Sequence, residues 1–187
     1  VTVLDQAAEG TTAALIDEPT AELAVAASRA RGFLDGAALA EVFAWLRPND
    51  LIWNYWVNNY LQGRPPPAFD ILYWNADTTR MPAALHRDFM RIALENALVR
   101  PGEVHVLGTP VDLSAITVDS YLVAGIADHI TPWQSCYRSI RLLGSKSRFI
   151  LSTSGHIAAL VNPPGNPKAR YQINKGTPAD PEDWLKT

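Results

Sequence analysis

Residues 120–156 read SYLVAGIADHITPWQSCYRSIRLLGSKSRFILSTSGH, and this stretch decides the fold. Two short apolar runs typical of strands, 120–125 and 147–152, flank the segment 132–144, where apolar side chains recur at helical spacing. A strand, a helix and a second strand in this order are typical of a parallel sheet with a crossover helix. The sequence therefore predicts an α/β fold.

The chain before this stretch is predicted to be mostly helical. Helical patterns cover 19–31, with Gly32 and Gly36 as candidate ends, then 37–46, and 77–98 reads as a turn followed by a helix. Two further runs, 69–75 and 103–108, have the composition of strands. We find no internal repeat and no low-complexity segment.

Composition bounds the class of protein. The 187 residues are 48% hydrophobic and 19% charged with a net charge of −3, which is typical of a globular domain. The absence of a basic block argues against nucleic-acid binding. No apolar run in the sequence reaches the roughly 18 residues of a membrane span. The single cysteine, Cys136, excludes internal disulfides and fits a reducing compartment.

The first five residues, VTVLD, read as a buried strand without a start methionine or a targeting signal. We therefore expect the chain to be part of a longer protein.

Two chemistry-bearing residues follow the predicted strands. Asp128 comes after the run 120–125 and His156 after the run 147–152, and the carboxyl ends of neighbouring parallel strands meet at one edge of a sheet. A carboxylate that accepts a hydrogen bond from imidazole Nδ1 prepares the ring to act as a base, and Asp before His is the order that hydrolase-type sheets use. In the alternative interpretation, Asp128 caps the helix that begins near Pro132 and His156 only ends a strand.

The other candidates are weaker. No Gly-x-Ser/Cys-x-Gly turn occurs anywhere in the 187 residues, so the sequence contains no nucleophile elbow, and Ser154 does not have the right surroundings. Cys136 lies on the apolar face of a predicted helix, where cysteine is usually an inert packing residue. The spacing of His and Cys gives no metal motif. We expect structural roles for the three other histidines, His86, His105 and His129.

Four long motifs carry a resemblance to a known family. They are LRPNDLIWNYWVNNYLQG at 46–63, PPAFDILYWNADTTRMP at 66–82, DHITPWQSCYRS at 128–139 and SGHIAALVNPPGNPKARY at 154–171. Together they resemble the C-terminal half of polyhydroxyalkanoate synthases, with more similarity to the class that uses medium-chain-length monomers.

The resemblance implies a partial α/β-hydrolase fold, the C-terminal part of its parallel sheet, with a mostly helical cap insertion. Residues 1–8 would then form a core strand, 9–99 the cap, and 100–187 the C-terminal part of the catalytic domain. The run 69–75 belongs to either the core or the cap.

The resemblance also implies an activity. These synthases transfer (R)-3-hydroxyacyl groups from CoA thioesters to a growing polyester through a Cys-His-Asp triad and without a cofactor. Asp128 and His156 match the Asp and His, and the Cys would lie upstream of Val1, so we expect the 187 residues alone to be inactive. The whole enzyme is expected to be a cytoplasmic homodimer at the surface of polymer granules.

Three questions stay open from the sequence. Asp128 either orients His156 or assists the 3-hydroxyl of the substrate, and we favour the second role. Four aromatic residues of the cap, Trp53, Tyr55, Trp56 and Tyr60, line an acyl channel, form a dimer face or simply pack. The alternative functions are an esterase or polyester depolymerase with an upstream serine, and a non-catalytic granule-binding subunit.

Overall fold

The computed structural model describes residues 5, 17–46, 48–66, 77–128, 130–156, 158–163 and 165–187. The chain divides into two compact units, one made of Val1–Ala21 with Met90–Thr187 and the other of Glu22–Phe89. Asp128 and His156 both belong to the first unit. The predicted strand at 69–75 and, apart from Asp5, the predicted strand at 1–8 lie outside the described residues.

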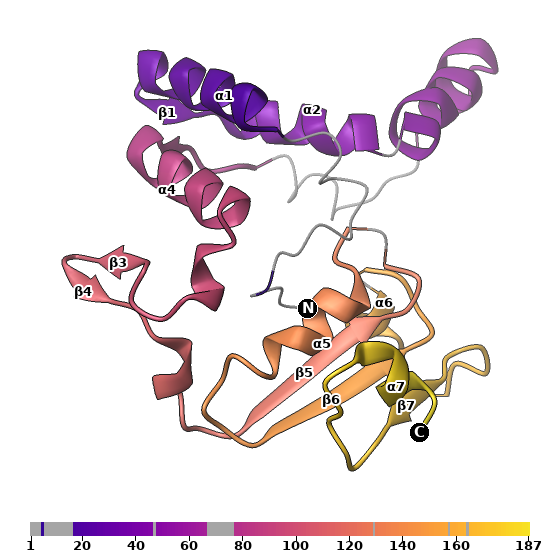
Figure 1. Cartoon of the computed structure of the whole chain (residues 1–187). Helices are drawn as coiled ribbons and strands as arrows, with labels where there is room; N and C mark the ends of the chain where they lie inside the picture. Colours follow the sequence, from indigo (N-terminus) through magenta and orange to yellow (C-terminus); the bar gives the residue numbers. More distant parts are fainter. Residues whose placement is uncertain are drawn as a thin grey trace. The chain divides into compact units, whose positions relative to one another are not determined.

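The first unit is built on the three-stranded sheet β5-β6-β7. β5 (Ser120–Gly125) and β6 (Ser147–Ser152) are parallel, with Ser120 opposite Ser147 and Gly125 opposite Ser152. Figure 1 shows the two strands side by side and pointing to the same end, where α6 (Ala158–Val161) lies. The predicted strand–helix–strand order is confirmed, because α5 (Trp133–Ser139) connects the two strands.

Two details of this unit differ from the prediction. The helix α5 ends at Ser139 instead of continuing to residue 144, and hydrogen-bonded turns follow it. A third strand, β7 (Tyr171–Ile173), pairs antiparallel with β6. Its three residues give a hydrophobic pattern too short to be recognised in the sequence.

An aromatic cluster forms the core beside this sheet. Tyr137 of α5, Phe149 of β6 and Trp184 of α7 (Pro181–Leu185) are buried, and their ring centroids lie 5.0 to 5.7 Å apart. Aromatic pairs at these separations add to the free energy of burial. Asp180 begins α7 by accepting a hydrogen bond from the backbone N–H of Glu182. The contact between the rings of Phe149 and Trp184 fixes α7 to the sheet.

The predicted strand at 103–108 is wrong in its extent. Only β3 (His105–Val106) forms, and it pairs antiparallel with β4 (Thr109–Pro110) in a separate hairpin. Leu107 and Gly108 make the turn, with φ of 51° and 81°. A two-residue turn of this kind needs positive φ, which glycine adopts without strain. The run 103–108 does not form one strand, because the turn at Leu107 and Gly108 lies within it.

The second unit is mostly helical, as predicted. Its helices are α1 (Glu18–Arg31), whose first turn continues from the first unit, α2 (Gly36–Leu46) and α4 (Ala83–Leu94), whose last turn continues into it. This unit also contains two π-helical segments, η2 (Asn49–Trp53) and η3 (Trp56–Leu61), and a short antiparallel pair of strands, β1 (Phe33–Leu34) and β2 (Met81–Pro82). Two 3-10 turns belong to the first unit instead, namely η4 (Ala97–Val99) and η5 (Leu113–Ala115).

The ends of the helices show how glycine is used in this unit. Gly32 ends α1 with φ of 82°, as predicted. The prediction that Gly36 also ends a helix is wrong, because Gly36 begins α2. A Cβ at Gly36 would lie 1.8 Å from Oγ1 of Thr78, so this glycine is required for a close approach of two chain segments.

Three of the four aromatic residues singled out from the sequence are exposed, and the fourth, Tyr55, is partly buried. Trp53, Trp56 and Tyr60 are exposed, and the rings of Trp56 and Tyr60 stack with centroids 4.4 Å apart. In the part of the chain that the structure describes, no helix combines the length and the apolar character required to cross a bilayer.

Candidate active site

The site lies where the two parallel strands end. Asp128 comes three residues after Gly125, the last residue of β5, and His156 comes four residues after Ser152, the last residue of β6. The backbone N–H of Ile126 donates to the carbonyl of Ser152 (2.8 Å), which extends the strand pairing beyond the sheet. The two loops therefore leave the same edge of the sheet side by side.

These loops bring the two predicted residues together. Nδ1 of His156 lies 2.8 Å from Oδ2 of Asp128, although the residues are 28 positions apart in the sequence. The side chain of Asp128 is fully buried, whereas that of His156 is 37% exposed. Since Nδ1 donates to the carboxylate, Nε2 is the basic atom of the neutral imidazole. The side chain of His156 is therefore partly accessible from solvent, unlike that of its partner.

Asp128 uses all of its acceptor capacity in this arrangement. Oδ1 accepts from the backbone N–H groups of Ile130 and Thr131, both at 2.9 Å. Oδ2 accepts from the hydroxyl of Thr131 at 2.6 Å and from His156. A carboxylate offers about four acceptor positions, so all of them are taken. The N-cap of α5 is Pro132, and Asp128 therefore holds the loop before the helix instead of capping the helix itself.

The hydrogen bonds keep Asp128 ionised. Burial raises the pKa of this carboxyl, but the hydrogen bonds from Thr131, His156 and Ile130 outweigh burial and hold the pKa below its ordinary value. The carboxylate, hydrogen-bonded to Nδ1, fixes the orientation and the tautomer of the His156 ring. The pair therefore has the electrostatics of a general base and its carboxylate partner.

The loop that carries His156 packs against the end of β5. A Cβ at Gly125 would lie 2.4 Å from the carbonyl oxygen of Ser154, so only glycine permits this approach. The hydroxyl of Ser154 accepts a hydrogen bond from the side-chain amide of Asn162, which follows α6. Gly125, Thr131 and Asn162 were not identified from the sequence. Gly125 could have been identified from its place at the end of a predicted strand, where a glycine often marks a close approach of another backbone segment.

Cys136 is unsuited to act as a nucleophile. It is buried on α5, and burial together with the charge of Asp128 raises the pKa of its thiol to about 11. A thiol with such a pKa is almost entirely protonated at neutral pH.

Two of the other histidines, His86 and His105, lie in other elements of the fold. His86 is buried in the second unit, with its Nδ1 2.9 Å from the hydroxyl of Ser28, and His105 lies exposed on β3. His129 lies outside the described residues. Among the residues that the structure places, no group of three or more His, Cys, Asp and Glu could hold a metal ion.

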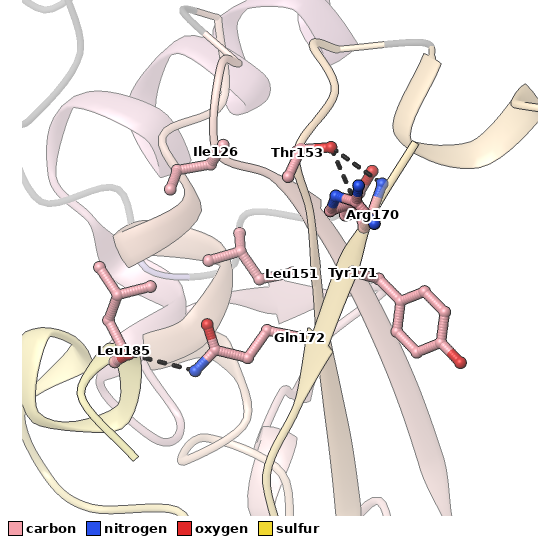
Figure 2. A pocket seen from close by; sticks show the side chains of 8 residues that line it. Ile126, Leu151, Thr153, Arg170, Tyr171, Gln172 and Leu185 are labelled. Atoms are coloured by element: carbon pink, nitrogen blue, oxygen red, sulfur yellow. Dashed lines mark hydrogen bonds between the residues drawn. The ribbon is translucent and has the colours of Figure 1, made fainter. Parts of the chain in front are cut away.

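A cavity of about 210 Å³ opens beside the ends of β6 and β7. Figure 2 shows Thr153 and Arg170 joined by hydrogen bonds at one side of it, with the ring of Tyr171 pointing away from them. The residues that line it are Ile126, Leu151, Ser152, Thr153, Arg170, Tyr171, Gln172 and Leu185. The cavity shares the two loops with the site, but neither Asp128 nor His156 lines it.

The sequence matches the α/β-hydrolase fold family over residues 5–163. The chain belongs to the α/β-hydrolase fold family. The predicted fold class is thereby confirmed, and an Asp and a His at the ends of successive strands fit this family.

Similar proteins are named poly(3-hydroxyalkanoate) polymerases. Polymerase 1 of Ectopseudomonas oleovorans is 55% identical over 184 residues, which are 98% of this chain and 33% of that protein. Polymerase 2 of the same organism is 56% identical over 185 residues, 99% of this chain and 33% of that protein. The polymerase subunit PhaC of Cupriavidus necator is 42% identical over 190 residues, 98% of this chain and 32% of that protein.

The resemblance stated from the four motifs is confirmed by these identities. The chain spans about a third of the length of these relatives.

Proposed function

We propose that this chain supplies the Asp and the His of the catalytic triad of a poly(3-hydroxyalkanoate) polymerase. The reaction transfers (R)-3-hydroxyacyl groups from CoA thioesters to a growing polyester. The observation that carries the proposal is the hydrogen bond between Asp128 and His156, in a chain that is 55% identical to a polymerase of this name. The exposed side of the His156 ring provides room for the reacting groups.

The proposed reaction uses His156 twice. Nε2 first takes the proton of a cysteine thiol that lies in the polymerase outside these 187 residues, and the thiolate attacks the thioester carbonyl. The carbon–sulfur bond to CoA breaks, and the CoA thiolate leaves and takes up the proton from the imidazolium. Nε2 then accepts the proton of the attacking hydroxyl. The ester bond forms as the acyl–sulfur bond to the cysteine breaks, and the cysteine thiolate takes the proton back from the imidazolium. No cofactor is needed, because the thioester is itself activated.

The geometry favours one of the two roles considered for Asp128. Its side chain is fully buried, and its acceptor positions are taken by Ile130, Thr131 and His156. A substrate hydroxyl would have to displace one of these donors before Asp128 could accept its proton. We therefore assign Asp128 the orienting role, contrary to the role favoured from the sequence.

The wider context of the enzyme is also part of the proposal. The whole polymerase acts as a cytoplasmic homodimer at the surface of the polymer granule, with medium-chain-length monomers as substrates. The exposed rings of Trp53, Trp56 and Tyr60 support contacts of the cap with apolar material.

A hybrid enzyme tests the proposal. In it, this chain replaces the aligned third of polymerase 1 of Ectopseudomonas oleovorans, and polyester formed from 3-hydroxyacyl-CoA is measured. We expect the hybrid to make polymer and the His156→Ala hybrid to make none. Cys136→Ser is the matched control and should leave the rate within about twofold, because the Cys136 thiol is buried and protonated. An inactive hybrid that is folded would contradict the proposal.

The alternative is a serine esterase or depolymerase on the same fold, with which the match to the α/β-hydrolase family is equally compatible. The acyl-enzyme distinguishes the two. A cysteine thioester is cleaved by neutral hydroxylamine, whereas a serine ester is stable under these conditions. The test uses the whole protein that contains this chain, because the nucleophile of the hybrid comes from polymerase 1. We expect the label that radioactive acyl-CoA leaves on that protein to be released by hydroxylamine.

A further inference from the structure

Thr131 contacts both members of the Asp128–His156 pair and does not only hold the loop. Its backbone N–H donates to Oδ1 of Asp128, and its hydroxyl donates to Oδ2 at 2.6 Å. The same hydroxyl oxygen lies 3.3 Å from Nδ1 of His156. The hydroxyl oxygen of Thr131, Oδ2 of Asp128 and Nδ1 of His156 therefore form a triangle, in which each atom lies within 3.3 Å of the other two.

One arrangement of protons satisfies this triangle. A hydroxyl has a single proton, and the short contact to Oδ2 shows that Thr131 donates it to the carboxylate. The proton on Nδ1 of His156 then points to Oδ2 at 2.8 Å, with the hydroxyl oxygen of Thr131 as a second, longer acceptor. Both acceptors stabilise the proton on Nδ1, which leaves Nε2 as the base.

We propose that Thr131 is a positioning residue, whose hydroxyl fixes Oδ2 of Asp128 against Nδ1 of His156 and shares that oxygen with the imidazole. The geometric part of the proposal stands on the contacts alone. Its consequence for catalysis rests on the proposed polymerase function.

The contacts also define the variants that isolate the hydroxyl. The two bonds to Oδ1 come from backbone N–H groups, so a change of the Thr131 side chain leaves them in place. Thr131→Val keeps the shape of the side chain and removes the hydroxyl, whereas Thr131→Ser keeps the hydroxyl and removes the methyl group. Thr131→Ala can replace the valine variant if the latter does not fold.

The first test does not depend on activity. In proton spectra of the 187-residue chain, the Nδ1–H of His156 should give a low-field resonance, assigned by its loss in His156→Gln. We expect this resonance to be unchanged in Thr131→Ser and to move to lower field in Thr131→Val, because Oδ2 then accepts from the imidazole alone. Identical spectra for the serine and valine variants, or no such resonance in the unsubstituted chain, would overturn the proposal.

The second test measures catalysis in the hybrid polymerase. We expect Thr131→Val to slow the release of CoA in a single turnover by about tenfold, because a buried acceptor position on a charged group is left empty. Loss of this hydrogen bond also raises the pKa of Asp128, so the stability that the ionised carboxylate adds at neutral pH should be smaller in Thr131→Val, as measured by urea unfolding. Thr131→Ser should retain the rate and the stability of the unsubstituted protein.

The two tests separate the two claims. If the unsubstituted hybrid is inactive but the resonance moves only in Thr131→Val, the polymerase function fails and the positioning role of Thr131 stands. If the hybrid is active and Thr131→Val changes neither the spectrum nor the rate, the positioning role fails and the polymerase function stands.

Discussion

Asp128 is a charged side chain that the fold removes from water and supplies with hydrogen-bond donors. Its pKa in the folded chain lies below the ordinary value of 3.8, because donors from Thr131, His156 and Ile130 outweigh burial. A carboxyl with a lowered pKa adds stability that is complete well above pH 3.8 and is lost as the pH falls through its folded value. Asp128 therefore stabilises the chain at neutral pH and no longer does so in strong acid.

Asp128→Asn should consequently reduce the free energy of unfolding more at pH 7 than at pH 3. Urea unfolding of the two proteins at both pH values measures this difference. An equal loss at both pH values would mean that the charge of Asp128 has no part in its effect on stability.

At this scale the sequence predicted the two principal residues but not their partners. Asp128 and His156 were identifiable because each follows an apolar run and because their order fits the fold. Thr131 was not, because its role depends on a loop that turns its hydroxyl and its N–H toward the same carboxylate. Such a turn leaves no periodic pattern in a sequence.

The ends of β5 and β6 are the elements on which the geometry of the site depends. The carbonyl of Ser154 lies so close to Gly125 that a Cβ would meet it at 2.4 Å. Gly125→Ala must therefore push the His156 loop away from Asp128. We expect a loss of about 1–3 kcal/mol in stability, measured by urea unfolding, together with loss of the low-field Nδ1–H resonance.

Gly155→Ala is the matched control in the same loop. Its Cβ would lie 3.7 Å from the carbonyl of Ala127, which is an ordinary contact. If the two variants lost equal amounts of stability, the close approach at Gly125 would not be what holds the loop.

The sequence predicted the longer strands and helices but not the shortest strands, and the reason is physical. The strands β5 and β6 have six residues each and are apolar enough to be recognised, and the helices α1, α2 and α4 are 11 to 14 residues long. The strand β7 and the hairpin of β3 and β4 have three residues or fewer per strand. Pairing with a neighbour determines such short strands, and a local pattern does not record it.

At the scale of the whole molecule, the last helix completes the core of the first unit. Trp184 is fully buried and contacts the rings of Tyr137, Phe149 and Trp133. Trp184→Ala should lower the free energy of unfolding by about 3–5 kcal/mol, because it leaves a large cavity. Thermal unfolding measures the loss, and Trp45→Ala, at a side chain that is 73% exposed, should change little. A similar loss for both variants would contradict this description of the core.

At this scale we propose that Asp128 and His156 act together as the base of a polyester polymerase. The most direct measurement is the release of CoA in a single turnover of the hybrid polymerase, compared with His156→Ala and Asp128→Asn. We predict that both variants lose the first acyl transfer, His156→Ala by roughly three orders of magnitude or more, and that elongation falls with it in Asp128→Asn. A normal first transfer of one acyl group per site in His156→Ala would contradict the account.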